Sequence, residues 1–300
     1  MPDKSRAAVW ASFCGDALAL AAHWEYDTQR LARDFGRLGE PRDPPPGSYH
    51  QGKKAGDFTH YGDQALVLLE HLAANPRFDL DDFAARWRRL FDGYQGYVDQ
   101  ATRQTLENFA AGAPPQEAGS QVGELGGAAR IAPLLWALGD DLYELLEAVR
   151  LQTRLTHHHP HTLAAAEFLA RAGHYCLGGE EPLRALELAA GAHYDAPVGQ
   201  WVELGISLRG EETAKAIART GQTCAAQQGL PAVVHLIARY PHDLQVALIE
   251  NVMAGGDSAA RGMAAGMILG AARGMSYVPG RWVARLTRCG LIRELLACRE

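Results

Sequence analysis

Carboxylate side chains are concentrated where four predicted apolar helices begin. Each of these starts follows a polar stretch that contains glycine: "CGDALALAAHWEY" (14–26), "AGDFTHYGDQALVLL" (55–69), "GELGGAARIAPLL" (123–135) and "GGDSAARGM" (255–263). If the four starts converge in the fold, they form a cleft rich in carboxylates and free backbone N–H groups. Such a cleft could hold a divalent cation through oxygen ligands or an anion on the helix N-termini. Taken one at a time, each acid is explained more simply as a helix cap or as a solvated surface group.

The last of these starts leads into a helix with a row of glycines. They recur at every fourth residue: Gly262, Gly266, Gly270 and Gly274. Each glycine disfavours a helix by roughly 1 kcal/mol relative to alanine, so the row needs a reason. Glycines at this spacing form one ridge without side chains, which indicates the close approach of a second helix. Alternatively, the ridge brings the backbone close to a bound ligand that Asp257 faces. Either Asp257 or Ser258 stands where an N-cap is expected.

Helical periodicity dominates the elements that must position these residues. The spacing of apolar residues predicts helices over 62–74, 80–94, 140–151, 162–175, 230–239, 244–252 and 285–297. No run of alternating β-branched residues indicates a strand. The segment 36–56 is too rich in proline and glycine for a regular element and is predicted to be a long loop. We therefore predict one all-α domain of a dozen or more helices that covers residues 1–300.

The composition restricts the class of protein. Of the 300 residues 47% are hydrophobic, and the formal net charge is −6, as in ordinary globular proteins. No apolar stretch is long enough for a membrane span, and the N-terminus lacks the features of a signal peptide. The five cysteines are scattered along the chain, which favours a reducing compartment. There is no basic run for a nucleic acid. We predict a cytoplasmic protein with a small-molecule partner, without nucleic acid or membrane; its oligomeric state is left open.

Five segments, in order, resemble one family. "GDALALAAHWE" is similar to G-D-A-x-G-x-x-x-E, "YGDQALVLLEHL" to T-D-D-T with its helix, "GGAARIAPLLW" to G-N-G-A-A-M-R-I-A-P, "LTHHHPHTLAAAEFLA" to the L-T-H-x-x-P helix, and "GGDSAARGMAAGMILGAARG" to G-G-D-T-D-T-x-A-A-x-x-G-A-x-x-G. The chain thus resembles the ADP-ribosylglycohydrolases, which include the dinitrogenase reductase-activating glycohydrolase and the J1-type crystallins. The resemblance implies an all-α, single-domain orthogonal multi-helix bundle. It also implies hydrolysis at a ribose anomeric carbon with two Mg²⁺ ions held by T-D-D-T and G-G-D-T-D-T.

The metal motifs are only partly present. Asp63 falls on the first acid of T-D-D-T, where Gly62 replaces the threonine and Gln64 the second acid. Asp257 falls on the first acid of G-G-D-T-D-T, where alanines at 259 and 260 replace the second acid and the final threonine. Two carboxylates and one amide cannot fill two octahedral Mg²⁺ sites. We predict that the dinuclear site is absent and that no cofactor is needed; the alternative is a single, weakly bound Mg²⁺ at Asp63 and Asp257.

Other family positions keep polar residues. Glu25 falls on the glutamate that the resemblance places beside the reacting sugar, and Trp24 before it could cover a ribose face. His157 falls on the L-T-H histidine. The backbone at Gly126 and Gly127, with Arg130, falls where the family contacts phosphate. The predicted ligand-binding residues are therefore Trp24, Gln64, Gly126, Gly127, Arg130, His157, Asp257 and Ser258.

Two functions remain open from the sequence. We favour a hydrolase for a glycosidic bond of an ADP-ribose-like or other ribosyl substrate, with Glu25 as general base and Asp57, His60 or Asp63 as the acid or the orienting group. An inverting glycosidase needs two carboxylates ~6.5–9.5 Å apart. The alternative is a non-catalytic member that binds a nucleotide-sugar ligand or has a structural, crystallin-like role. A cleft that the side chains fill would favour this alternative.

Overall fold

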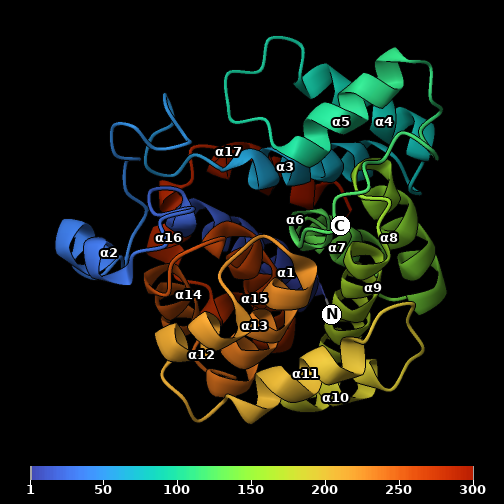
Figure 1. Cartoon of the computed structure of the whole chain (residues 1–300). Helices are drawn as coiled ribbons and strands as arrows, with labels where there is room; N and C mark the ends of the chain where they lie inside the picture. Colours follow the sequence, from blue (N-terminus) through green and yellow to red (C-terminus); the bar gives the residue numbers. More distant parts are fainter. Residues whose placement is uncertain (1, 300) are drawn as a thin grey trace.

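The computed structural model describes residues 2–299, and every regular element in that range is a helix (Figure 1). The predicted all-α class is confirmed. The short 3₁₀ helix Met275–Tyr277 follows α15. The α-helices are α1 (Pro2–Ala19), α2 (Thr28–Phe35), α3 (His60–Ala74), α4 (Leu80–Leu90), α5 (Gln100–Ala110), α6 (Gly126–Ala129), α7 (Ala132–Leu138), α8 (Leu142–Thr156), α9 (Pro160–Leu177), α10 (Pro182–Ala190), α11 (Val198–Ser207), α12 (Thr213–Thr220), α13 (Ala226–Arg239), α14 (Leu244–Met253), α15 (Ser258–Arg273), α16 (Gly280–Arg285) and α17 (Cys289–Ala297).

Two of the predicted helices end earlier or break. The predicted helix 80–94 ends at Leu90, and Gly93 has a φ of 77° in the turn that follows. The helix predicted over 285–297 is confirmed only from Cys289, where α17 begins, because α16 ends at Arg285. Between them the N–H of Thr287 donates to the carbonyl of Gly56 at 3.0 Å. The chain between α16 and α17 therefore makes a tertiary hydrogen bond to a distant loop, although the apolar spacing continues through this segment. Segment 36–56 has no regular element, as predicted.

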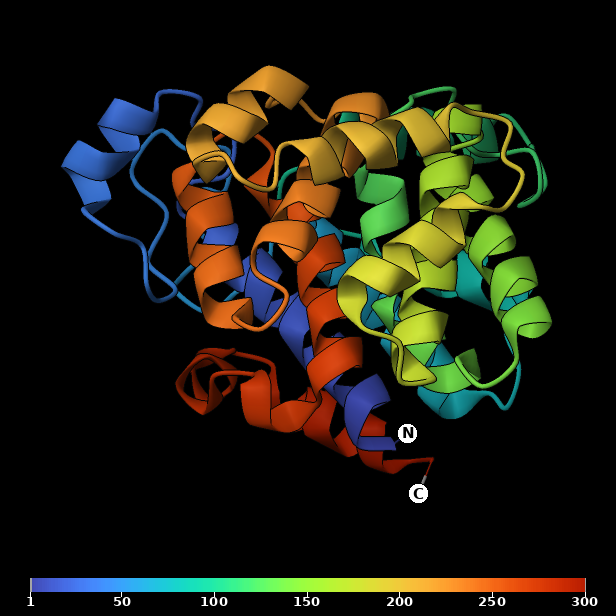
Figure 2. The same ribbon diagram turned by 90° about the horizontal axis from the view of Figure 1, so that it is seen from below.

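The glycine-rich helix α15 runs through the middle of the molecule beside α1 (Figure 2). A Cβ atom at Gly266 would lie 2.5 Å from the carbonyl oxygen of Ala11, and one at Gly270 would lie 2.5 Å from that of Ala7. The side-chain-free ridge therefore lets the two backbones touch, which confirms the predicted close approach of a second helix. Gly274 lies against the side chain of Asp3 in α1 and not against its backbone, and its φ of 80° ends the helix.

The entrance to α15 is fixed by a buried arginine. The Nε of Arg261 donates to Asn251 Oδ1 at 3.0 Å, and its Nη2 donates to the carbonyl of Gly255. Gly255 and Gly256 both have positive φ angles, 72° and 70°, which glycine tolerates best. This turn presents Asp257 to the starts of α3 and α6.

Among residues 2–299 no helix is long and apolar enough to cross a membrane.

Candidate functional site

Asp257 is the centre of the site and is almost completely buried. As predicted, it is the N-cap of α15: its Oδ1 accepts from the N–H of Ala260 at 3.3 Å. The same oxygen lies 2.9 Å from His23 Nε2, and Oδ2 accepts from the hydroxyl of Tyr61 at 3.4 Å. Burial alone would raise the pKa of Asp257, but the hydrogen bond from His23 holds it below its ordinary value. The carboxylate is therefore ionised and has both oxygens engaged within the protein.

A second imidazole continues this contact. His23 Nδ1 lies 2.8 Å from Nε2 of His50, a residue of the long 36–56 loop. Burial lowers the pKa of both imidazoles, so both rings are neutral at physiological pH. Sequence reasoning assigned no role to either residue, although His23 directly precedes Trp24 and Glu25.

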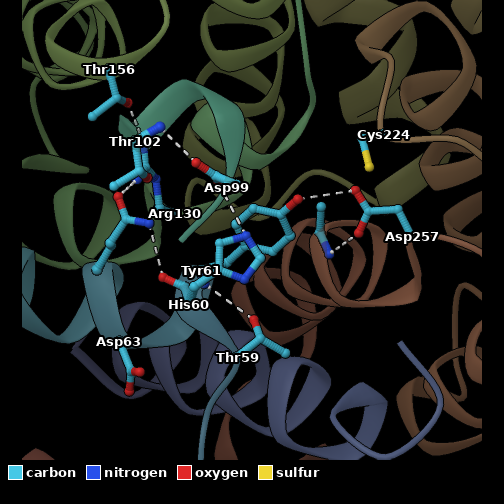
Figure 3. Close-up of polar contacts among 12 residues, drawn as sticks. Thr59, His60, Tyr61, Asp63, Asp99, Thr102, Arg130, Thr156, Cys224 and Asp257 are labelled. Atoms are coloured by element: carbon cyan, nitrogen blue, oxygen red, sulfur yellow. Dashed lines mark hydrogen bonds and ion pairs between the residues drawn. The ribbon is translucent and has the colours of Figure 1, made fainter. Parts of the chain in front are cut away.

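The start of α3 supplies His60 and Tyr61. Thr59 is the N-cap of α3. Its N–H donates to Oδ2 of the buried Asp16 at 2.7 Å, and its hydroxyl donates to Oδ1 of the same carboxylate at 2.5 Å. His60 Nε2 lies 3.1 Å from Asp99 Oδ2, and the Tyr61 hydroxyl points to Asp257 (Figure 3). The first turn of α3 therefore faces the entrance of α15.

The structure separates Asp63 from Asp257. The N-cap of α3 is Thr59, and the first two residues of the helix are His60 and Tyr61, which carry no carboxylate. Asp63 lies one turn further on; its Oδ2 accepts from Lys53 Nζ at 2.6 Å and from the Tyr94 hydroxyl at 2.5 Å. Figure 3 shows Asp63 and Asp257 on opposite sides of His60 and Tyr61. A single Mg²⁺ held by Asp63 and Asp257 together does not fit this arrangement.

The other proposed catalytic residues are also dispersed. Asp57 accepts from the Thr287 hydroxyl at 2.7 Å and from the N–H of Lys54 at 2.8 Å, at the loop beside α16. Glu25 lines a cleft together with Trp24 and pairs with Arg30 at 3.3 Å. Of the four residues proposed for catalysis, only His60 is part of the cluster around Asp257.

Several predicted ligand-binding residues are structural. Gln64 Oε1 accepts from Trp87 Nε1 at 2.7 Å and from Arg130 Nη1. Arg130 also donates to Thr156 and is 3% exposed, so its guanidinium is engaged inside the protein. The backbones at Gly126 and Gly127 lie against two rings: a Cβ there would lie 2.4 Å from the ring of Tyr61 and 2.6 Å from that of His157, respectively. Ser258 is fully buried, and Asp257 is the cap in its place.

Aromatic rings close the cluster toward solvent. Trp24 lies 5.0 Å from Tyr49 and 4.9 Å from Tyr97 between ring centroids, both edge to face. Tyr49 is 57% exposed, whereas His50 and His60 behind these rings are each 1% exposed. The interior of the predicted cleft is therefore filled by side chains.

Trp24 is held in an unfavourable conformation. Its φ of 67° is the only positive value at a non-glycine among the described residues, and such strain concentrates at functional sites. Its N–H donates to the carbonyl of Gly256 at 2.9 Å, and the N–H of Gly256 donates to the carbonyl of Glu25 at 2.7 Å. The indole Nε1 donates to Cys224 Sγ at 3.2 Å. These contacts fix Trp24 and Glu25 to the entrance of α15.

An open cleft of about 690 Å³ lies beside Trp24 and Tyr49, which form part of its lining. The carboxylate of Glu25, 27% exposed, faces Arg30 at 3.3 Å and accepts from the N–H of Asp27 at 2.9 Å. Arg30 lies 3.4 Å from Asp34 on its other side. The volume is in the range of small-molecule sites. Its lining includes His23, Trp24, Glu25, Arg30, Asp34 and Tyr49.

One further acid lies at the edge of the cluster. Glu124 is half-buried, and burial, together with the charges of Asp99 and Asp257, raises its pKa to about 7. Its backbone is joined to the segment after Cys224 by an isolated bridge to Ala225. The sequence placed Glu124 at a helix start but did not indicate its raised pKa, because Asp99 and Asp257 come from distant segments of the chain.

The fold and the site define an all-α protein built around a capped, glycine-rich central helix. A profile of the ADP-ribosylglycohydrolase family matches residues 1–299, and the chain belongs to this family, as its motifs indicated. It is 24% identical to "Crystallin J1A" of Tripedalia cystophora, covering 95% of this chain and 92% of that protein. It is 26% identical to "ADP-ribosyl-[dinitrogen reductase] glycohydrolase" of Rhodospirillum rubrum, covering 78% and 74%. A solved structure described as "ADP-ribosylglycohydrolase-related protein complex" superposes with a TM-score of 0.77 at 27% identity, covering 99% of this chain and 96% of that one.

Membership of this family supports a hydrolase-like role. The magnesium that the family typically uses does not fit the residues present. Both oxygens of Asp257 already accept hydrogen bonds, Asp63 is paired with Lys53, and the positions between them carry His60 and Tyr61. In the described part of the chain, no group of three or more His, Cys, Asp or Glu side chains is arranged to hold a metal ion. That the protein needs no cofactor stays a prediction.

Proposed function

We propose that the protein is a magnesium-independent hydrolase of the ADP-ribosylglycohydrolase type. Its substrate would be an ADP-ribosyl or similar ribosyl group, bound in the cleft of about 690 Å³ beside Trp24. The observation that carries the proposal is the position of Glu25. Its carboxylate lines an open cleft, and the strained backbone of Trp24 fixes it to the start of α15. The family relationship supplies the class of reaction.

In this proposal Glu25 takes a proton from the attacking water. Attack of the oxygen at the anomeric carbon breaks the glycosidic bond, and the leaving group departs with the bonding electron pair and takes up a proton from solvent in the open cleft. Asp34, on the other side of Arg30, is the second carboxylate of the cleft. Arg30 lies between them and partly offsets their negative charges. The rings of Trp24 and Tyr49 provide an apolar surface for the sugar or the base.

The test is release of ADP-ribose from an ADP-ribosyl-arginine substrate in the presence of EDTA. Wild-type protein is expected to release ADP-ribose at an undiminished rate when the chelator is present. Glu25→Gln should lower the rate by about 10²- to 10⁴-fold, the usual contribution of a general base. Glu40→Gln is the matched control, because Glu40 pairs with Arg281 and Arg285 outside the cleft. Turnover that disappears with EDTA, or that survives in Glu25→Gln, would refute the proposal.

A second candidate function follows from the closed interior. The imidazoles and rings around Asp257 fill the space behind the cleft, and one relative is named as a crystallin. A non-catalytic member would bind an ADP-ribose-like ligand, or no ligand, and would release no product in the same assay.

A further inference from the structure

A second cavity lies on the side of the molecule away from α2 and the cleft beside Trp24. Its volume of about 620 Å³ is in the range of small-molecule sites. Its walls come from α8, from the start of α9 and from the loop between α10 and α11, and both ribbon views place α8 and α9 far from α2 (Figures 1 and 2). It shares no lining residue with the cleft beside Trp24, so the proposed hydrolysis gives it no role.

One arginine of this cavity already has its partners. Arg150 donates from Nε and Nη2 to the two oxygens of Glu167, at 2.8 and 2.9 Å, and from Nη1 to Glu147 at 2.6 Å. Such a bidentate pair, completed by a second acid, leaves the guanidinium little charge to offer a ligand. Arg150 and Glu167 therefore form a fixed part of the wall.

Arg154, one turn further along α8, has no such partner. Its side chain is exposed, and in the described part of the chain it makes no hydrogen bond or ion pair. Burial and the charge of Arg154 lower the pKa of the neighbouring His158, so this ring adds hydrogen-bonding nitrogens and no charge. The cavity also reaches Pro160, where the 18-residue helix α9 begins, and a helix start favours a negative group. This side of the cavity is therefore suited to an anionic group.

The opposite charge comes from the loop between α10 and α11. Asp195 of this loop lines the cavity and is exposed, and among residues 2–299 its carboxylate has no hydrogen-bond or ion-pair partner. Arg154 and Asp195 thus line one cavity from different segments without pairing with each other. Apolar lining comes from Leu163, Ala164 and Tyr194, whose hydroxyl is engaged with the carbonyl of Ala189 at 2.7 Å.

We propose that this cavity binds a small zwitterion, with its anionic group on Arg154 and its ammonium group on Asp195. A guanidinium binds a carboxylate through two parallel hydrogen bonds, and a carboxylate accepts equally well from an ammonium group. A molecule with both charges therefore satisfies both side chains, whereas a simple anion or cation satisfies only one. Because part of the lining is apolar, an amino acid with an apolar side chain is the simplest ligand of this class. The site is independent of the proposed hydrolysis.

The test is calorimetric titration with L-phenylalanine, with phenylpropionate, which lacks the ammonium group, and with phenethylamine, which lacks the carboxylate. Wild-type protein should bind L-phenylalanine about tenfold or more tightly than either analogue, because each analogue loses one charge-assisted hydrogen-bonded contact. Arg154→Gln should weaken L-phenylalanine binding by about tenfold and leave phenethylamine binding unchanged. Asp195→Asn should weaken L-phenylalanine binding similarly and leave phenylpropionate binding unchanged.

Arg209→Gln is the matched control, because it removes an exposed positive charge outside the cavity, in the turn after α11. It should bind all three probes as the wild type does. Since Arg154 and Asp195 are exposed, their variants should also unfold at the wild-type urea concentration.

Three results would overturn the inference: no saturable binding of L-phenylalanine, equal affinity for the three probes, or an equal loss of L-phenylalanine and phenethylamine binding in Arg154→Gln. Glu25→Gln should bind L-phenylalanine as the wild type does. Zwitterion binding without hydrolysis would therefore refute only the proposed function, and hydrolysis without zwitterion binding would refute only this second site.

Discussion

Gly266→Leu is expected to destabilise the protein by about 3 kcal/mol or more, as measured by urea unfolding. Even the first carbon of the new side chain would lie 2.5 Å from the carbonyl oxygen of Ala11. The obstacle is backbone, so no side-chain rotation can relieve it, and α1 and α15 must move apart in the middle of the core. The loss would be a large fraction of the stability of an ordinary domain.

Gly199→Leu is the matched control for this substitution. Gly199 lies in α11, and a Cβ there would meet no atom within 4 Å. Leucine also has a better helix propensity than glycine, so this variant should unfold at the wild-type urea concentration or slightly above it. Equal unfolding of Gly266→Leu and wild type would show that the glycine ridge does not hold α1 and α15 together.

Asp257→Ala is expected to cost about 3 kcal/mol of stability, whether or not ligand is present. The substitution removes the cap of α15, which is worth about 1 kcal/mol. It also leaves His23 Nε2 and the Tyr61 hydroxyl buried without an acceptor, at about 1–3 kcal/mol for each group. Thermal or urea unfolding measures the loss. Asp257→Asn should lose less, since its amide oxygen can still accept.

Asp243→Ala separates the two contributions. Asp243 caps α14 by accepting from the N–H of Val246 at 2.9 Å, but it is exposed and has no buried partner of the kind that Asp257 has. Its replacement should cost only about 1 kcal/mol. If Asp257→Ala and Asp243→Ala lose the same stability, the contacts with His23 and Tyr61 contribute nothing.

Local patterns in the sequence predicted the framework of this site. The fourfold glycine spacing in α15 indicated the contact with α1, and the "GGDS" stretch indicated the cap at Asp257. Both features depend on residues within one helix or at its end, so spacing alone reveals them. The break at Thr287 depends on a hydrogen bond to Gly56, and no local pattern contains it.

The partners of Asp257 were not predictable in the same way. His23 is separated from it by more than two hundred residues, and His50 belongs to a loop without periodicity. The sequence also suggested that Asp63 could face Asp257, because both are acids at a helix start. One turn of helix separates Asp63 from the cap Thr59, and this turn directs Asp63 to Lys53 instead of the centre.

Hydrogen bonds from His23 and Tyr61 occupy the carboxylate of Asp257, which would otherwise be free to bind a metal ion. The most direct measurement is calorimetric titration of the protein with millimolar Mg²⁺ near neutral pH. We predict no saturable heat and little rise in melting temperature; even a site half-filled at its own Kd would add only about 0.4 kcal/mol. Tight binding of two Mg²⁺ ions per chain would show instead that the carboxylate of Asp257 is available to a metal ion.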